Sequence, residues 1–137
     1  MAVIENQIET KLTSAFQPAF LDVENESHKH NVPPGSESHF RVTVVSEEFE
    51  GMSLVKRHQK INEVLRDELK GPVHALSIRA KTPEQWEENA NLIQFAAYDI
   101  TAALTPLLPA TTIALLTIAV NFIVDWFLHH SSGIKDE

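Results

Sequence analysis

Residues 27–42, SHKHNVPPGSESHFRV, decide how the first part of this chain folds. The stretch begins with closely spaced histidines and passes through a Pro-Pro-Gly corner, where the proline rings fix φ and limit the freedom of the loop. It leads directly into HFRVTVVS, in which Phe40, Val42 and Val44 alternate with other residues. A period of two is typical of a strand with one face toward a core, so the sequence predicts a rigid loop joined to a sheet.

The segment before the loop predicts a helix followed by a short strand. Apolar residues recur at four-residue spacing, at Ile4, Ile8, Leu12 and Phe16. This spacing indicates a helix with one apolar face. Pro18 ends it, because a residue before proline is pushed out of the helical conformation. Leu21 and Val23 then alternate with acidic residues, and we expect this strand to pair antiparallel with the strand after the loop.

The segment after residue 45 predicts a helix, a third strand and a last helix. Ser53 is a candidate N-cap, and the stripe that follows it consists of Leu54, His58, Ile61, Leu65 and Leu69. Gly71 and the proline after it end this helix. Residues 73–80, VHALSIRA, read as a strand, and Thr82 begins another helix. The order helix-strand-strand-helix-strand-helix predicts an α+β domain over residues 1–90, with helices packed on a three-stranded sheet.

The composition excludes several kinds of site. The 137 residues include no cysteine, so a disulfide scaffold, a thiol nucleophile and a cysteine-based metal site are excluded. A net charge of -8 argues against a protein that coats nucleic acid, because such domains usually carry a basic stripe. The N-terminal residues have no continuous apolar core, so no secretory signal is expected and the predicted location is the cytoplasm.

Four histidines are the candidate functional residues of the domain. His28, His30 and His39 lie around the proline corner, and His74 opens the third strand. Neutral imidazole is a common metal ligand, yet solvated loop histidines and a hydrogen-bonded His74 explain the pattern as well. No H-x₃-H, HExxH or G-x-S-x-G motif occurs among them, so neither a conventional zinc site nor an enzyme is expected.

Residues 3–88 resemble the BolA family. The resemblance rests on PGSESHF in the loop, the pair Arg57-His58 in the second helix and VHAL at the third strand, in this order. It implies a class II KH-like fold of the αββααβ type, with a three-stranded sheet and helices on one face. It also implies a protein that is not an enzyme.

The resemblance further implies a partner and a cofactor. BolA proteins pair with monothiol glutaredoxins and share a glutathione-ligated [2Fe–2S] cluster, and they are linked to the stress response, iron homeostasis and cell morphology. The family's ligands fall here on His74 and His30, with His28 as the alternative. Two histidines can replace two cysteines on one iron. A cysteine of glutaredoxin and one of glutathione would complete the set, so no cluster is expected on this chain alone.

A DNA-binding transcriptional regulator is the alternative function, and it can coexist with the first. KH domains clamp a nucleic-acid backbone with a GxxG loop, but the corresponding residues 51–54, GMSL, lack the second glycine. The candidate DNA contacts are the basic residues Lys56, Arg57 and Lys60 near the start of the second helix. A solvated helix face explains these residues equally well. A homodimer is a further partner that the sequence leaves open.

Residues 91–137 depart from the family, whose chains usually end in a short polar tail. Residues 110–128 are apolar with a few polar interruptions, and their length is about that of one bilayer crossing. Pro106 and Pro109 prevent a clean helix before this run, so a single span is predicted. Three interpretations stay open: an anchor on the cytoplasmic face of the inner membrane, a helix buried against a partner, and a fused tail without a role in BolA function.

Overall fold

The computed structural model describes the backbone of residues 2–132 and the side chains of residues 2–127. The chain divides into two compact units, residues 1–83 and residues 84–137. Residue 90, where the sequence suggested that the domain ends, lies inside helix α4 (Pro83–Leu104). This helix continues because neither glycine nor proline occurs after its first residue to interrupt it.

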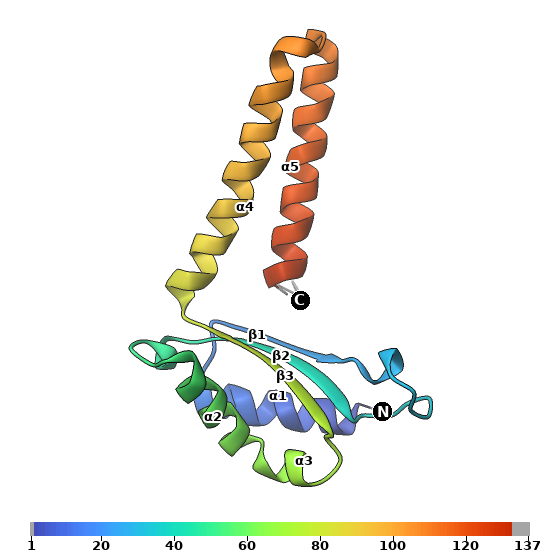
Figure 1. The fold of residues 1–137 in the computed structure, drawn as a ribbon, viewed down its shortest axis with the longest axis vertical. Helices are drawn as coiled ribbons and strands as arrows, with labels where there is room; N and C mark the ends of the chain where they lie inside the picture. Colours follow the sequence, from blue (N-terminus) through green and yellow to red (C-terminus); the bar gives the residue numbers. More distant parts are fainter. Residues whose placement is uncertain (1, 133–137) are drawn as a thin grey trace. The chain divides into compact units, whose positions relative to one another are not determined.

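The first unit is a three-stranded sheet with helices on one face (Figure 1). Its strands are β1 (Phe20–Asn25), β2 (His39–Val45) and β3 (Ala75–Lys81). Its helices are α1 (Val3–Phe16), α2 (Leu54–Val64) and α3 (Arg66–Lys70). The central strand β2 pairs antiparallel with β1 and parallel with β3. The α+β class, the antiparallel pair and the αββααβ order are therefore confirmed.

The core of this unit is built from the apolar stripes that the sequence predicts. Its buried members on α1 and β2 are Ile8, Leu12, Phe16, Phe40, Val42 and Val44. Ile61 and Leu65 pack into the same cluster from the second helical segment. Burying a side chain of this size stabilises a fold by about 1.5–3 kcal/mol, so these contacts hold the helices on the sheet.

The helix predicted over residues 54–69 is two helices in the structure. Leu65, with φ of -98° and ψ of 21°, interrupts the helix, and α3 follows directly. Glu68 on α3 is buried, and its carboxylate lies 2.8 Å from Nζ of Lys11 on α1. This ion pair joins segments that are far apart in the chain, and the apolar stripe contains no signal for it.

The second unit is a hairpin of two long helices (Figure 1). Helix α4 ends at Leu104, a 3-10 turn spans Thr105–Leu107, and helix α5 spans Ala110–Ser132. The helix predicted from residue 110 is confirmed, and it starts directly after Pro109 as expected. The helical residues of α4 beyond residue 90 were not predicted.

The N-terminus of α1 is capped by a residue from the loop before β2. The Glu37 carboxylate accepts N–H bonds from Val3 (3.2 Å), Ile4 (3.1 Å) and Glu5 (3.2 Å). Ala2, at the N-cap position, makes no side-chain cap. A negative charge is favourable at a helix N-terminus, where the first N–H groups have no partner within the helix. Glu37 therefore ties the histidine-containing loop to α1.

We expect Glu37→Gln to destabilise the first unit by about 1 kcal/mol, because an amide keeps an acceptor but loses the charge that faces the helix dipole. Native-state hydrogen exchange of the buried β2 amides should then be roughly five-fold faster. Glu50→Gln, at an exposed position, is the matched control and should leave exchange unchanged. Equal exchange in both variants would show that the cap does not support the fold.

Candidate metal centre

The loop between β1 and β2 is closed by two polar side chains. Ser27 is buried, and its Oγ accepts N–H bonds from Ser38 at 3.0 Å and His39 at 3.1 Å. Asn25 accepts the N–H of Ser27 at 3.0 Å, and its Nδ2 donates to the carbonyl of Ser36 at 3.0 Å. These bonds join the beginning of the loop to its end, so the loop is held in one conformation.

His30 and His39 stack on each other where this loop meets β2. His30 follows the 3-10 turn η1 (Ser27–Lys29), and its N–H donates to the carbonyl of Ser27 at 3.0 Å. The ring centroids of His30 and His39 are 4.0 Å apart with an interplanar angle of 20°. Nδ1 of His39 also lies 2.8 Å from Oγ of Ser38. The turn thus brings a loop histidine onto the first residue of the central strand.

His74 reaches the same place from the residue before β3. Its N–H donates to the carbonyl of Ser38 at 2.8 Å, and the N–H of Ala75 donates to that carbonyl at 3.2 Å. Ala75 is the register partner of His39 in the parallel pair. The ring centroids of His74 and His39 are 6.4 Å apart. His30, His39 and His74 therefore form one cluster, the histidine rim, in which His39 is the common neighbour.

The two predicted ligands of the histidine rim are open to solvent. His30 and His74 are exposed, whereas His39 is half-buried. Among residues 2–127, no group of three or more His, Asp or Glu side chains is arranged to hold a metal ion. The rim therefore presents two solvent-accessible imidazoles, those of His30 and His74.

His28, the alternative ligand, lies in a different environment. It lines a hollow together with Val32 and the Pro33-Pro34-Gly35 corner. Gly35 has φ of +77°, a left-handed conformation that favours glycine. In the part of the chain that the structure describes, His28 makes no ring contact with the histidine rim. Of the two loop histidines, His30 is the one placed beside the ring cluster.

The centre of the histidine rim resists protonation. Loss of solvent around the ring lowers the pKa of His39, and the charges that His30 and His74 carry when protonated lower it further. Imidazole must be neutral to bind a metal. The surroundings of His39 therefore favour the neutral form of this ring.

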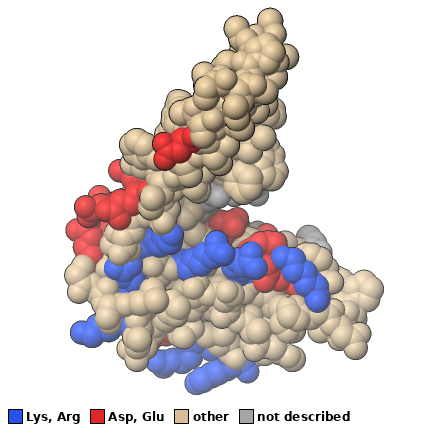
Figure 2. Space-filling model, turned by 45° about the horizontal axis from the view of Figure 1, so that its top comes forward, with Lys and Arg blue, Asp and Glu red and all other residues tan. Residues whose placement is uncertain are grey.

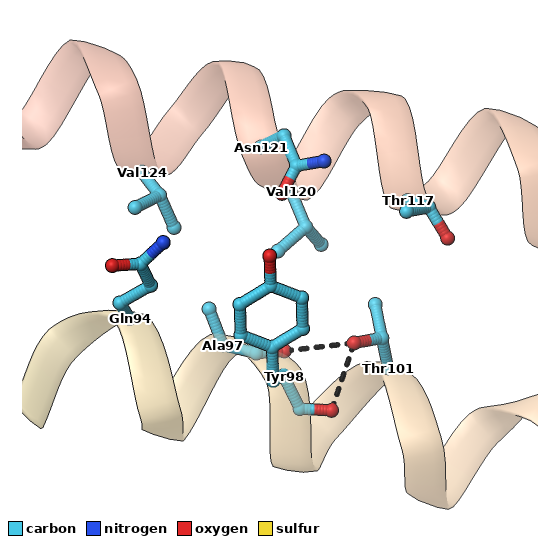
Figure 3. Close-up of a pocket in the computed structure, with 8 residues that line it drawn as sticks. All are labelled: Gln94, Ala97, Tyr98, Thr101, Thr117, Val120, Asn121 and Val124. Atoms are coloured by element: carbon cyan, nitrogen blue, oxygen red, sulfur yellow. Dashed lines mark hydrogen bonds between the residues drawn. The ribbon is translucent and has the colours of Figure 1, made fainter. Parts of the chain in front are cut away.

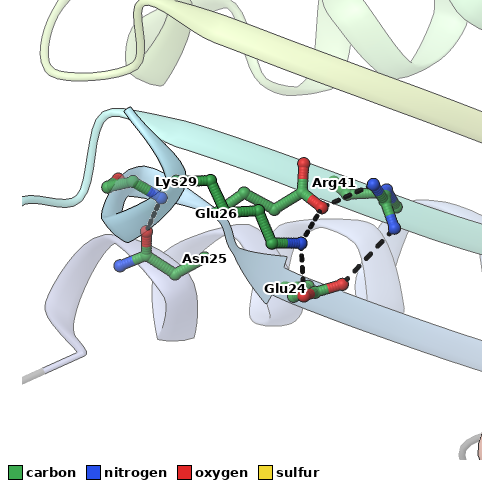
Figure 4. A network of polar contacts seen from close by, with 6 residues as sticks. Glu24, Asn25, Glu26, Lys29 and Arg41 are labelled. Atoms are coloured by element: carbon green, nitrogen blue, oxygen red, sulfur yellow. Dashed lines mark hydrogen bonds and ion pairs between the residues drawn. The ribbon is translucent and has the colours of Figure 1, made fainter. Parts of the chain in front are cut away.

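An ion-pair network fixes the turn that carries the loop histidines (Figure 4). Nζ of Lys29 lies 2.7 Å from the Glu26 carboxylate and 3.3 Å from that of Glu24. Arg41 on β2 pairs with the same two glutamates. The hydrogen bond from Lys29, assisted by the charge of Arg41, lowers the pKa of Glu26. Because Lys29 directly precedes His30, this network restricts the position of His30 from the side of β1.

The structure separates the three candidate DNA contacts. Lys56 and Lys60 are exposed on α2. Arg57 is only 7% exposed, and its guanidinium donates to the carbonyls of Met52 and Ala80, both at 3.1 Å. Arg57 therefore links α2 to β3, whereas Lys56 and Lys60 are the two candidate DNA contacts with exposed side chains. Charge and helix position alone gave no sign of the two carbonyl partners of Arg57.

Comparison with known proteins gives a family match. Residues 12–85 match the family model described as BolA-like protein. BolA-like protein 1 of Homo sapiens is 55% identical over 89 residues, which are 65% of this chain and 65% of that protein. The DNA-binding transcriptional regulator BolA of Escherichia coli is 49% identical over 85 residues, 62% of this chain and 81% of that protein. The chain thus spans slightly less than two thirds of the mammalian relatives that it matches.

Solved structures agree with the match. The solution structure of BolA1 from Mus musculus has a TM-score of 0.60 and 55% identity, and covers 65% of this chain and 72% of that one. The BolA domain of SufE1 from Arabidopsis thaliana has a TM-score of 0.58 and 44% identity, and covers 62% of this chain and 98% of that one. The family match ends at residue 85, so almost all of the α4–α5 hairpin lies outside it.

We expect the metal-free protein to lose stability as the pH falls below about 6.5, the ordinary pKa of histidine. The lowered pKa of His39 means that the unfolded chain takes up this proton more readily than the folded one. The contribution is fully present above that pH and disappears as the pH falls through the folded-state pKa. His39→Phe keeps a ring but does not titrate, so its unfolding free energy in urea should fall less between about pH 7 and pH 5.

His28→Phe is the matched control for this experiment, because His28 lies outside the rim contacts among the described residues. It should keep the pH dependence of the parent protein. If His39→Phe also keeps that dependence, the histidine rim does not govern the acid sensitivity of the fold.

Proposed function

The chain belongs to the BolA family, and on this premise we propose that it is a non-catalytic regulatory protein that pairs with a monothiol glutaredoxin. In the complex, His30 and His74 bind a [2Fe–2S] cluster that the two proteins share with glutathione. The observation that carries this proposal is the contact of His39 with both His30 and His74 at one exposed rim. The expected cellular roles are in the stress response, iron homeostasis and cell morphology.

The residues of the rim fit such a cluster. Iron–sulfur clusters are held mainly by thiolates, but two imidazoles can replace two cysteines on one iron. This chain has no cysteine, so it can supply imidazole nitrogens and no sulfur. The missing thiolates would come from one cysteine of glutaredoxin and one of glutathione. A chain that offers two ligands would depend on its partner for the cluster.

The loop that carries His30 is ordered before any partner arrives. The Ser27 hydroxyl closes it, and the Lys29–Glu26 ion pair holds its 3-10 turn. A pre-ordered loop loses less conformational entropy when it binds. His39 is a positioning residue in this proposal, because its stacking limits the rotation of the His30 ring. Solvent-exposed His30 and His74 leave room for the partner to approach.

Titration of cluster-loaded glutaredoxin with the full chain tests the proposal. We expect the visible absorption and circular dichroism of the cluster to change, because imidazole ligation alters its electronic structure. His74→Ala and His30→Ala should each abolish most of this change. His28→Ala is the matched control, two positions from His30, and should behave like the parent protein.

A spectrum that stays constant on titration would overturn the proposal. A spectral change that survives in the double variant of His30 and His74 would show that glutaredoxin binds without these ligands. If His28→Ala alone removes the change, the cluster uses the other loop histidine. Each variant should first be shown to keep its far-UV circular dichroism.

A DNA-binding regulator is the second candidate function. One observation favours it: relatives from Vibrio cholerae and Escherichia coli carry the name DNA-binding transcriptional regulator BolA. The exposed Lys56 and Lys60 on α2 are the side chains available for phosphate contacts. Residues 51–54 lack the second glycine of a GxxG clamp, so contacts through lysine to phosphate would dominate the affinity. Such binding depends strongly on salt.

We expect charge reversal of Lys56 and Lys60 to weaken DNA binding at least ten-fold and to reduce the slope of log K against log salt by about two. Fluorescence anisotropy with a labelled duplex at several salt concentrations measures both quantities. The control is Lys70→Glu, which changes another exposed lysine on α3. Affinity that is insensitive to Lys56 and Lys60 would remove this mechanism.

A further inference from the structure

The two helices of the α4–α5 hairpin face each other through a mixture of polar and apolar side chains, the latter including Ala97, Val120 and Val124. Figure 3 shows the narrow space between the two helices, lined by Gln94 and Thr101 from α4 and by Thr117 and Asn121 from α5. Thr101 donates to the carbonyls of Ala97 at 3.0 Å and Tyr98 at 2.8 Å, and Thr117 donates to that of Ile113 at 2.9 Å. Both threonine hydroxyls are thus satisfied within their own helices.

Large apolar side chains lie on the outside of the same hairpin. The most exposed of them on the long helices are Leu92, Phe95, Leu115, Ile118 and Phe122, each at least 66% exposed. Leu107, in the turn between the helices, is 76% exposed. A helix pair in water normally buries its apolar stripe and exposes its polar one. This hairpin instead leaves large apolar side chains of both helices exposed.

The scarcity of charged residues in the hairpin agrees with its exposed apolar side chains. Between residues 89 and 124, Asp99 is the sole charged residue, and the sequence from 82 to 134 contains neither lysine nor arginine. Helix pairs in membranes pack through small and hydroxyl-bearing residues and present large apolar residues to the lipid. In Figure 2 the part of the hairpin toward its turn is almost entirely free of charged side chains. Exposed apolar side chains in such number mark an interaction site, and a surface with so few charges fits acyl chains.

We propose that the α4–α5 hairpin, residues 92–127, inserts into a lipid bilayer with its turn first, so that both of its ends stay on the same side. Among the described residues, α5 is the one helix long and apolar enough to cross a membrane, and its residues Ala110–Phe127 have a mean hydropathy of 1.7 and are 6% buried within the protein. At 1.5 Å per residue these residues span about 27 Å, close to the hydrocarbon thickness of about 30 Å. This arrangement replaces the single crossing expected from the sequence.

The two ends of the hairpin differ in charge, as insertion with the turn first requires. The turn, residues 105–109, reads TPLLP and carries no charge. The opposite end carries Glu84, Glu87 and Glu88 at the start of α4, and acidic groups of this kind stay in water. Trp126 and Phe127 lie at that end of α5 with ring centroids 5.3 Å apart, where aromatic residues favour the membrane interface.

Two carboxylates, Asp99 and Asp125, oppose insertion, and Asp99 lies deeper, because Asp125 precedes Trp126 at the end of the hairpin opposite the turn. Asp99 lies five positions before the end of α4, about 8 Å from the turn. With the turn near the far headgroups, the Asp99 carboxylate lies inside the hydrocarbon, about half-way between that interface and the bilayer centre, where a charge is costly. The proposal therefore predicts that Asp99→Asn strengthens membrane binding.

Flotation of the full chain with phosphatidylcholine vesicles tests insertion. We expect the parent protein to float, Asp99→Asn to float at least as well, and the pair Ile118→Arg with Phe122→Arg to lose at least ten-fold in partitioning. The matched control adds the same charges at Thr10→Arg and Ser14→Arg, exposed positions on α1, and should float like the parent. Far-UV circular dichroism shows that the helices persist in each variant.

The absence of cysteine allows a second test that separates the hairpin from a single crossing. One cysteine is introduced at Glu88→Cys, at Leu107→Cys, or after residue 137, and a membrane-impermeant maleimide is added to preformed vesicles. The hairpin predicts labelling at residue 88 and after residue 137, with protection at residue 107. Protection after residue 137 would overturn the hairpin.

Parent protein that fails to float, or that forms a soluble dimer through the hairpin instead, would overturn the proposal altogether. Neither result would affect the proposed iron–sulfur function, because His30 and His74 lie in the unit that matches the family.

Discussion

Two oxygen atoms, the Ser27 hydroxyl and the Ser38 carbonyl, hold the histidine rim together. The hydroxyl accepts the N–H groups of Ser38 and His39, and the carbonyl accepts those of His74 and Ala75. These four bonds join the loop, the first residue of β2 and the entry to β3 at one corner of the sheet. The main chain is fixed at each of these points. The imidazoles therefore have little conformational freedom left beyond the rotation of their own side chains. The metal-binding proposal depends on this corner more than on any other contact.

The order of the secondary structure could be predicted from the sequence, because each element has a local signal. Four-residue spacing indicated α1, alternation indicated β1 and β2, and the turn after Lys70 separated the second helical segment from β3. The break at Leu65 could not be predicted, because it accompanies the pairing of Glu68 with Lys11 some distance away in the chain. The part of α4 beyond residue 90 could not be predicted in this way, because the resemblance ends at residue 88.

The residues of the candidate site could be proposed from the sequence, but their arrangement in space could be predicted only in part. His30 and His74 followed from the resemblance, while the stack of His30 on His39 depends on the 3-10 turn after β1, which alternation along β2 does not reveal. Arg57 had the charge and the helix position of a DNA contact, yet it is buried against two backbone carbonyls. Every residue has a backbone carbonyl, so residue types do not show which carbonyls an arginine will bond.

Pulsed EPR of the reduced cluster in the complex with glutaredoxin tests the central claim most directly. The chain is labelled with ¹⁵N-histidine, so that any imidazole bound to iron is detected through its hyperfine coupling. If His30 and His74 share one iron, two coupled nitrogens are expected in the parent protein, one in either single alanine variant and none in the double variant. No histidine coupling in the parent complex, or coupling that persists in the double variant, would contradict the account.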